Sequence, residues 1–234
     1  MNNANIFVNV SMLIILIIFF RKLIGNFMEA HVTNQPLVFG SRYLRETKEN
    51  LDIKASILEN PSKSMKYTYN LWLFFENISS ENIDSDNVDK EIFIHKSQSG
   101  TSGTSGTNPF ELFYNHKSST IYAKINNTKY SIVVPQQKWI NISINIDTTI
   151  VDFYLDSELV KSEKLADITN IPGGNIELIT SCCAEESKKS GIYGYIDIFR
   201  YFNEYLKPDR VKELYLSGAP GKKDNPSDNT FWWY

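Results

Sequence analysis

Two adjacent thiols are the side chains of this sequence best suited to nucleophilic chemistry. Cys182 and Cys183 follow one another directly, and the side chains that could act as bases are His31, His95 and His116. Adjacent cysteines cannot easily reach disulfide geometry, and the sequence holds no second pair that would complete a zinc site. Because no local motif joins a thiol to a histidine, we interpret them as free thiols and scattered histidines.

An acidic stretch before an expected strand is the candidate for metal binding. Asp84, Asp86 and Asp89 offer the carboxylate oxygens that calcium prefers, but the stretch lacks the glycine and the spacing of an EF-hand loop. Acidic loops of this kind are most often solvated surface, and that is the leading interpretation, with a calcium site as the alternative. We expect no other cofactor, because neither a glycine-rich phosphate loop nor a His-Glu-x-x-His pattern occurs.

The sequence ends in four consecutive aromatic residues. Phe231, Trp232, Trp233 and Tyr234 follow a charged segment that resembles a linker, so residues 221–234 are expected to form a tail. Such rings avoid water by folding back on the domain, by entering a groove of a partner, or by lying at a membrane interface. All three placements stay open, and the four residues are candidates for partner or membrane contact.

Nearly all of the continuous apolar sequence lies within residues 1–25. Residues 6–20 are apolar apart from Asn9 and Ser11, and Arg21 and Lys22 follow them. A helix of that length spans about 22 Å, so a short extension and snorkelling of the basic pair would complete a bilayer crossing. The residues expected to contact lipid are Ile6, Phe7, Met12, Leu13, Ile14, Ile15, Leu16, Ile17, Ile18, Phe19 and Phe20.

The basic pair also predicts an orientation. A cleavable signal peptide would carry basic residues before the apolar run, and no Lys or Arg occurs there. The basic pair after the run favours a cytoplasmic position for the bulk of the chain. A cleaved signal peptide and a buried core helix are the alternatives. We therefore predict a single-pass membrane protein.

The charge balance argues against one class of partner. The 234 residues carry a net charge of −3, and the isoelectric point is near 5.7. A protein that binds nucleic acid by neutralising phosphates needs a basic surface, so we expect no nucleic-acid partner. The length suits one ordinary domain plus appendages.

Short alternating segments predict that this domain is all-β. The clearest strand is residues 140–147, with four isoleucines on one side, and Asp156-Ser157 predicts the tight turn of a hairpin after residues 150–155. A helix is expected from Pro208, and residues 26–50 are expected to connect the anchor to the domain. Other strands are expected at residues 67–76, 90–95, 110–114, 120–125, 129–134, 175–180 and 193–201, with a flexible loop at 98–109 and a turn at 172–174.

The order of these motifs resembles the laminin-G-like branch of the concanavalin A-like jelly rolls. The segments around Trp72 and Trp139 resemble two strands of that family, and residues 151–160 resemble its hairpin, with Ser157 where Gly is usual. Residues 194–203 and the helix after them resemble its closing elements. The resemblance implies a two-sheet antiparallel jelly-roll sandwich at residues 51–220.

The same resemblance suggests roles for individual residues. We expect Trp72 and Trp139 in the core, and we expect Asp156 and Asp197 to close turns and satisfy backbone groups. Glycanases of this superfamily resemble one another in a Glu-x-Asp-x-x-Glu strand. The nearest segment here, which starts at Glu177, lacks the other two carboxylates, so we expect no enzyme.

These features together predict a membrane-anchored binding or structural protein that contacts other proteins of an assembly. The alternative is a membrane-bound lectin that binds glycans through rim loops at residues 84–90 and 97–108, with or without calcium. The anchor and the Asn-, Ile- and Lys-rich composition are also similar to those of membrane-linked proteins of large cytoplasmic DNA viruses. That similarity implies a virion or capsid-associated component.

Overall fold

The computed structural model divides into two units, Met1–Gln35 and Pro36–Tyr234. It describes residues 12, 16, 40–44, 51–58, 66–77, 89–97, 108–165, 172–178 and 192–218. In the first unit Met12 and Leu16 are helical, with 68% and 50% of their surface exposed. The other residues of the predicted anchor lie outside the described part. Among the described residues, no helix has the length and apolar character needed to cross a bilayer.

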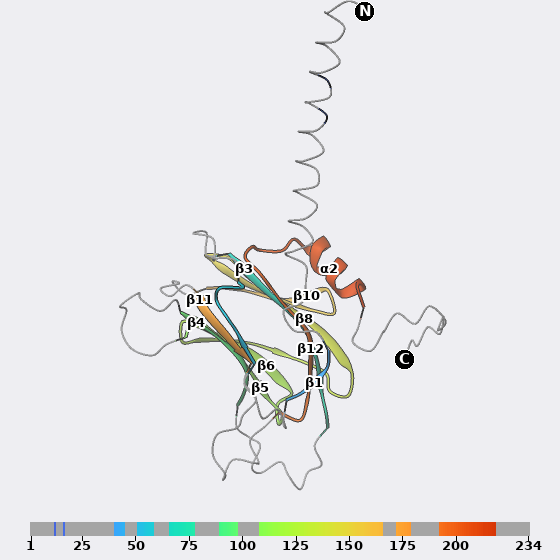
Figure 1. The fold of residues 1–234 in the computed structure, drawn as a ribbon. Helices are drawn as coiled ribbons and strands as arrows, with labels where there is room; N and C mark the ends of the chain where they lie inside the picture. Colours follow the sequence, from blue (N-terminus) through green and yellow to red (C-terminus); the bar gives the residue numbers. More distant parts are fainter. Residues whose placement is uncertain are drawn as a thin grey trace, which may run out of the picture. The chain divides into compact units, whose positions relative to one another are not determined.

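The second unit is a sandwich of two six-stranded antiparallel sheets (Figure 1). The first sheet consists, in spatial order, of β1 (Arg42–Tyr43), β12 (Gly194–Phe202), β3 (Tyr67–Phe75), β8 (Trp139–Ile146), β9 (Ile150–Leu155) and β10 (Glu158–Lys164). The second sheet consists of β2 (Leu51–Ile53), β11 (Pro172–Leu178), β4 (Lys90–Ser97), β5 (Phe110–Asn115), β6 (Thr120–Ile125) and β7 (Thr128–Val133).

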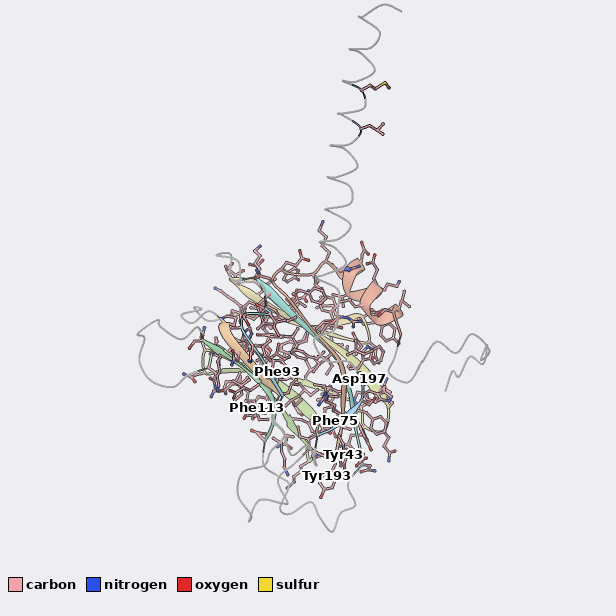
Figure 2. The ribbon with its side chains drawn as sticks, in the orientation of Figure 1. Tyr43, Phe75, Phe93, Phe113, Tyr193 and Asp197 are labelled. Atoms are coloured by element: carbon pink, nitrogen blue, oxygen red, sulfur yellow. The ribbon has the colours of Figure 1, made fainter. Side chains whose placement is uncertain are left out.

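Alternation along the strands supplies the core between the sheets. Every second residue of β8 is an isoleucine, and these side chains are fully buried because they face the second sheet. Phe75 of β3 crosses the gap and stacks on Tyr114 of β5, with ring centroids 3.7 Å apart. Phe93 of β4 is also fully buried, and Figure 2 labels both phenylalanines inside the sandwich. Burying a side chain of this kind contributes roughly 1.5–3 kcal/mol.

Polar residues of β8 lie on the outward side of the first sheet, and part of this side is buried beneath helix α2 (Pro208–Leu216). Asn141 and Asn145 alternate with the isoleucines of β8 and are 1% and 0% exposed. The Asn145 side-chain amide donates to the Leu206 carbonyl at 2.7 Å. A separate apolar cluster holds the helix on the sheet and consists of Tyr154, Phe202, Leu206, Val211 and Leu214.

The edges of the two sheets differ from one side of the sandwich to the other. On one side the edge strands are short, because β1 has two residues and β2 has three. On the other side the edge strands are β10 and β7. They are joined where the Lys161 ammonium of β10 donates to the Ser131 carbonyl of β7 at 2.8 Å.

Two hairpins turn on residues in the left-handed region. Asn126 and Asn127 join β6 to β7 with φ values of 47° and 71°, and Asp156 and Ser157 join β9 to β10 with 50° and 72°. Positive φ at both central residues is the type I′ arrangement, which matches the twist of the strands. The hairpin expected after residues 150–155 is therefore confirmed.

All the strands expected from the sequence are present, with ends shifted by a few residues, and the helix begins at Pro208 as expected. The turn expected at residues 172–174 is wrong, because this segment begins β11. Pro172 occupies the first strand position, where its missing N–H is tolerated. Gly174 allows β11 to approach β4, since a Cβ there would lie 2.4 Å from the Ser97 carbonyl oxygen.

Residues 40–44 also belong to the sandwich, although the sequence interpretation placed them in the connection of residues 26–50. Arg42 and Tyr43 form β1, and Leu44 is 2% exposed within the core. A strand of two residues contains no alternation, so no pattern in the sequence predicts it.

Candidate functional site

Four aromatic side chains lie in one line across the outward side of the first sheet. Tyr43 of β1 pairs in register with Tyr195 of β12. Phe74 of β3 pairs with Tyr195 on one side and with Trp139 of β8 on the other. Ring centroids are 4.8 Å apart for Tyr43 and Tyr195, 6.2 Å for Tyr195 and Phe74, and 5.7 Å for Phe74 and Trp139. We call these four residues the aromatic row.

Strand alternation places the aromatic row outside the core. Phe75 and Ile140 point inward and are fully buried, so Phe74 and Trp139, their neighbours in the chain, point outward. All four rings of the row are half-buried, because each covers part of the next. Tyr43, labelled in Figure 2, lies at the end of the sandwich away from helix α2. The row is thus a partly exposed aromatic surface on a rigid sheet.

Polar groups border the aromatic row. The Tyr43 hydroxyl donates to Glu76 Oε2 at 3.3 Å. Next to Trp139, the Lys138 ammonium and the Asp156 carboxylate form an ion pair, with Nζ and Oδ2 3.1 Å apart. The border therefore presents both signs of charge beside an apolar centre.

Asp197 fixes one end of this surface. Its Oδ1 atom accepts from the backbone N–H groups of Gly40 at 2.9 Å and Ile198 at 2.7 Å, and its Oδ2 atom accepts from the Ser41 hydroxyl at 2.7 Å. These bonds hold the segment before β1 against β12 and so position Tyr43. Asp197 has the structural role expected for it.

Asp156 fixes the other end in the same manner. Its Oδ1 atom accepts from the backbone N–H of Asn141 at 2.8 Å, and its own N–H donates to the Asn141 carbonyl at 2.8 Å. The tight turn of the β9–β10 hairpin is thereby attached to β8, close to Trp139. The expected structural role of Asp156 also holds.

The two tryptophans that were expected in the core lie elsewhere. Trp139 is half-buried in the aromatic row, because its position on β8 faces outward. Trp72 is only 3% exposed, but it is buried beneath the helix, where its ring stacks on Tyr215 with centroids 5.7 Å apart. Neither indole lies between the two sheets.

A polar network continues from Trp72 beneath the helix. Asn70 donates to Asn141 Oδ1 at 2.9 Å and to Ser143 Oγ at 2.8 Å, and it accepts from Arg200 at 3.2 Å. Burial lowers the pKa of Arg200 to about 10, and the nearby Arg210 acts in the same direction. The guanidinium is still charged at neutral pH, so the network joins β3, β8 and β12 around a buried cation.

The outward side of the second sheet gathers carboxylates. Glu111 accepts from Lys124 Nζ at 3.0 Å, and Glu177 forms an ion pair with a lysine of β4. Burial raises the pKa of Glu91 to about 7, with Glu111 adding to the shift, Lys124 opposing it and Glu177 adding again. The arrangement brings Glu177 and two further glutamates to one sheet face.

Of the predicted metal site, only Asp89 lies among the residues that the structure describes. Asp89 accepts from the Asn115 amide at 3.0 Å and from Lys129 Nζ at 3.1 Å. Burial acts to raise its pKa, but the hydrogen bonds from Tyr122, Asn115 and Lys129 outweigh burial and lower it. Asp84 and Asp86 lie outside the described residues, and within those residues no group of three or more His, Cys, Asp or Glu side chains could hold a metal.

Two of the candidate bases, His95 and His116, are described, and each makes a hydrogen bond within the fold. His95 is 1% exposed between the sheets, and its Nδ1 atom lies 2.7 Å from the Tyr69 hydroxyl. His116 accepts from the backbone N–H of Tyr193 at 3.1 Å. The remaining predicted site residues lie outside the described part, namely His31, Cys182, Cys183, Phe231, Trp232, Trp233 and Tyr234.

The sequence interpretation missed the aromatic row. Tyr43 lies in a segment without strand pattern, and Tyr195 was one aromatic among several in its strand. The available signal is that Phe74, Trp139 and Tyr195 each lie at an outward position near a strand end. Only the register between the strands shows that these positions are adjacent.

Comparison with known proteins supports the architecture. No family model matches the sequence, and no curated protein matches it. Among solved structures, the receptor-binding domain of botulinum neurotoxin D matches with a TM-score of 0.55 and 14% identity, over 78% of this chain and 45% of that chain. The receptor-binding domain of the C/D mosaic serotype has a TM-score of 0.54 and 16% identity, over 78% and 44%.

The serotype G binding domain has a TM-score of 0.50 and 16% identity, over 79% of this chain and 46% of that chain. The chain therefore spans less than half the length of these structures. At such identities the likeness is one of fold. The second unit is an all-β, two-sheet sandwich of the concanavalin A-like jelly-roll type, similar to that in botulinum neurotoxin receptor-binding domains.

Proposed function

We propose that this chain is a non-enzymatic binding protein held at a membrane, and that the aromatic row is its contact surface for another protein. The observation that carries the proposal is the alignment of Tyr43, Tyr195, Phe74 and Trp139 on the outward side of the first sheet. These four rings keep part of their surface exposed and adjoin one another, and a contiguous exposed apolar patch marks an interaction site more often than a single exposed ring does.

The composition of the surface supports protein contact. Tyrosine and tryptophan are enriched among the residues that dominate interface energies, above all when a polar border surrounds them. Glu76, Lys138 and Asp156 supply that border with charges of both signs. The similarity to toxin domains that bind receptors is consistent with a binding role for the fold, although the partners of those proteins do not transfer.

The predicted anchor at residues 1–25 supplies the second half of the proposal. A domain tethered to a bilayer meets its membrane-associated partners at a raised local concentration, so a modest interface is sufficient. A laminin-G-like module on such an anchor, on the cytoplasmic side, would suit a virion or capsid-associated component. The aromatic tail of residues 231–234 would add a second partner or membrane contact.

Site-specific cross-linking tests the contact surface. The full-length chain, expressed in its native host membrane and solubilised in mild detergent, would carry a photoreactive residue at Tyr195 or, as the matched control, at Phe113. Phe113 is a half-buried ring on the outward side of the second sheet. We expect one defined protein adduct from position 195, and we expect Trp139→Ala to abolish it. Adducts of equal yield from both positions would contradict the proposal.

A membrane-bound lectin is the second candidate, and the aromatic row also favours it. Sugar rings stack on aromatic faces, and the hydroxyl of Tyr43 and the carboxylate of Glu76 lie beside the rings as hydrogen-bonding groups. A glycan array with the full-length chain, with and without calcium, separates the two functions. Binding that is lost in Trp139→Ala would support the lectin, whereas the absence of any bound glycan would leave protein contact.

A further inference from the structure

A cluster of polar rings lies between the two sheets at one end of the sandwich. The ring of Tyr69 contacts those of Tyr67, Tyr201 and His95, with centroid distances of 5.6, 5.4 and 5.9 Å. His95 and Tyr201 are themselves 5.2 Å apart. The tyrosines belong to β3 and β12 of the first sheet and His95 to β4 of the second, so the cluster is a polar junction between the sheets.

The cluster satisfies only part of its hydrogen-bonding capacity. The Tyr69 hydroxyl and His95 Nδ1 are bonded at 2.7 Å. The hydroxyls of Tyr67 and Tyr201 and the Nε2 atom of His95 are buried and lack a hydrogen-bond partner among the described residues. The Gly174 backbone lies close to the His95 ring and acts to raise its pKa. Three such atoms in one cluster are unusual, because buried polar atoms in native proteins are nearly all paired.

We propose that Tyr67, Tyr201 and His95 form a binding site for a small neutral hydrogen-bonding molecule of the size of water, which links the first sheet to the second. Two hydroxyls and one imidazole nitrogen offer three partners, within the two to four that a buried water uses. A tyrosine hydroxyl both donates and accepts, so the site can satisfy either direction of a water hydrogen bond.

Apolar rings also pack around Tyr69, the residue that all the other rings of the cluster contact. Tyr69 is also in contact with Phe93 at 5.1 Å, Phe110 at 4.3 Å and Phe199 at 6.4 Å. All three phenylalanines are fully buried, and Phe93 is labelled within the sandwich in Figure 2. These phenylalanines offer no hydrogen-bonding group, so the polar atoms of the cluster are those of the tyrosines and His95.

The electrostatics of the cluster favour a neutral occupant. Burial lowers the pKa of His95 to about 3, and the Gly174 backbone opposes that shift only in part. Burial also raises the pKa values of Tyr67, with Tyr201 adding to the shift, and of Tyr201. All three side chains are therefore neutral at physiological pH, and none offers a counter-charge to an ion.

Removing the hydroxyls one at a time tests the site in the full-length chain. If one molecule joins Tyr67 and Tyr201, Tyr67→Phe and Tyr201→Phe each lower the melting temperature. The double variant then lowers it by less than the sum, because the first loss already breaks the bridge. If the hydroxyls are unpaired, either substitution leaves the melting temperature unchanged or raises it, and that result would overturn the proposal. Additive losses would overturn it as well.

A direct hydrogen bond elsewhere provides the control. The Tyr114 hydroxyl accepts from Gln136 Nε2 at 3.0 Å, outside the cluster. Tyr114→Phe calibrates the loss of one hydroxyl bond and should add to Tyr67→Phe without coupling. A high-resolution crystal structure completes the test. A water peak within hydrogen-bonding distance of both hydroxyls is expected, whereas an empty site, or an organic molecule released on denaturation and detected by mass spectrometry, would refute a water-sized occupant.

Discussion

Single side chains in this protein hold strand ends together, and Asp197 does so through three hydrogen bonds. Asp197→Ala leaves the N–H groups of Gly40 and Ile198 and the hydroxyl of Ser41 without their acceptor. We expect the free energy of unfolding, measured by urea denaturation, to fall by about 2–3 kcal/mol. Asp209→Ala, at the exposed start of α2, is the control and should cost less than 1 kcal/mol. Equal losses would contradict the anchoring role.

Glu91 should make the free energy of unfolding fall as the pH rises, which is opposite to the effect of a carboxylate whose pKa is lowered in the folded state. Its pKa is raised from 4.5 to about 7, so the folded state holds the proton more tightly than the unfolded state. The stability that protonation confers is complete below pH 4.5 and is lost as the pH rises through 7. Glu91→Gln should therefore stabilise the protein above pH 7 by about 1–2 kcal/mol, a figure reduced for solvent screening.

Denaturation curves at pH 4 and pH 8 check this expectation. At pH 4 the variant and the parent should unfold at nearly the same denaturant concentration, because Glu91 is protonated in both states of the parent. Glu163→Gln, on the exposed edge strand β10, is the control. A stabilisation by Glu91→Gln that is the same at both pH values would mean that the charge is not its cause.

Among the elements, the β9–β10 hairpin carries a residue unsuited to its conformation. Ser157 has a φ of 72°, in the left-handed region where side chains with a Cβ are disfavoured. Ser157→Gly should raise the free energy of unfolding by roughly 0.5–1 kcal/mol, which thermal or urea unfolding would detect. The β6–β7 hairpin offers a matched control at Asn127, where φ is 71°. Since asparagine tolerates this region better, Asn127→Gly should gain less, and equal gains would contradict the explanation.

The same elements show what a sequence can predict here. Strands such as β8 and β9 are predictable because every second residue is apolar, and α2 is predictable because Pro208 starts a helix with apolar residues at the correct spacing. β1 is too short to show alternation. Segment 172–174 appears as a turn in any local interpretation, because only the position of β4 beside it explains why Gly174 is needed in a strand.

The candidate site was less predictable than the fold for a related reason. Phe74, Trp139 and Tyr195 are separated by dozens of residues and become neighbours only through the register of β3 with β8 and β12. Trp139 was expected in the core because the segment around it resembles a strand of the concanavalin A-like jelly rolls. It lies on the outward side because Ile140, its neighbour on β8, faces the core.

For the whole molecule, His95 predicts sensitivity to acid. Burial lowers its pKa from 6.5 to about 3, so the unfolded chain takes up a proton in this range while the folded chain does not. The stability contributed by the neutral ring is present above pH 6.5 and is lost as the pH falls toward 3, by roughly 3–5 kcal/mol in total.

Unfolding of the full-length chain between pH 7 and pH 4 measures this loss. We expect His95→Gln to be less stable than the parent at pH 7 but to lose much less stability on acidification. His116→Gln controls for the removal of a histidine ring elsewhere. Parallel loss of stability in the parent and in His95→Gln would show that other groups cause the acid response.

The edges of the sandwich bear on its behaviour at high concentration. A sheet whose edge strand has free N–H and C=O groups can recruit further strands and grow into aggregates. Here β1 and β2 are too short to act as templates, and Lys161 ties β10 to Ser131 of β7 on the opposite side. Many copies of the domain crowded together would therefore be protected from polymerising through their sheets.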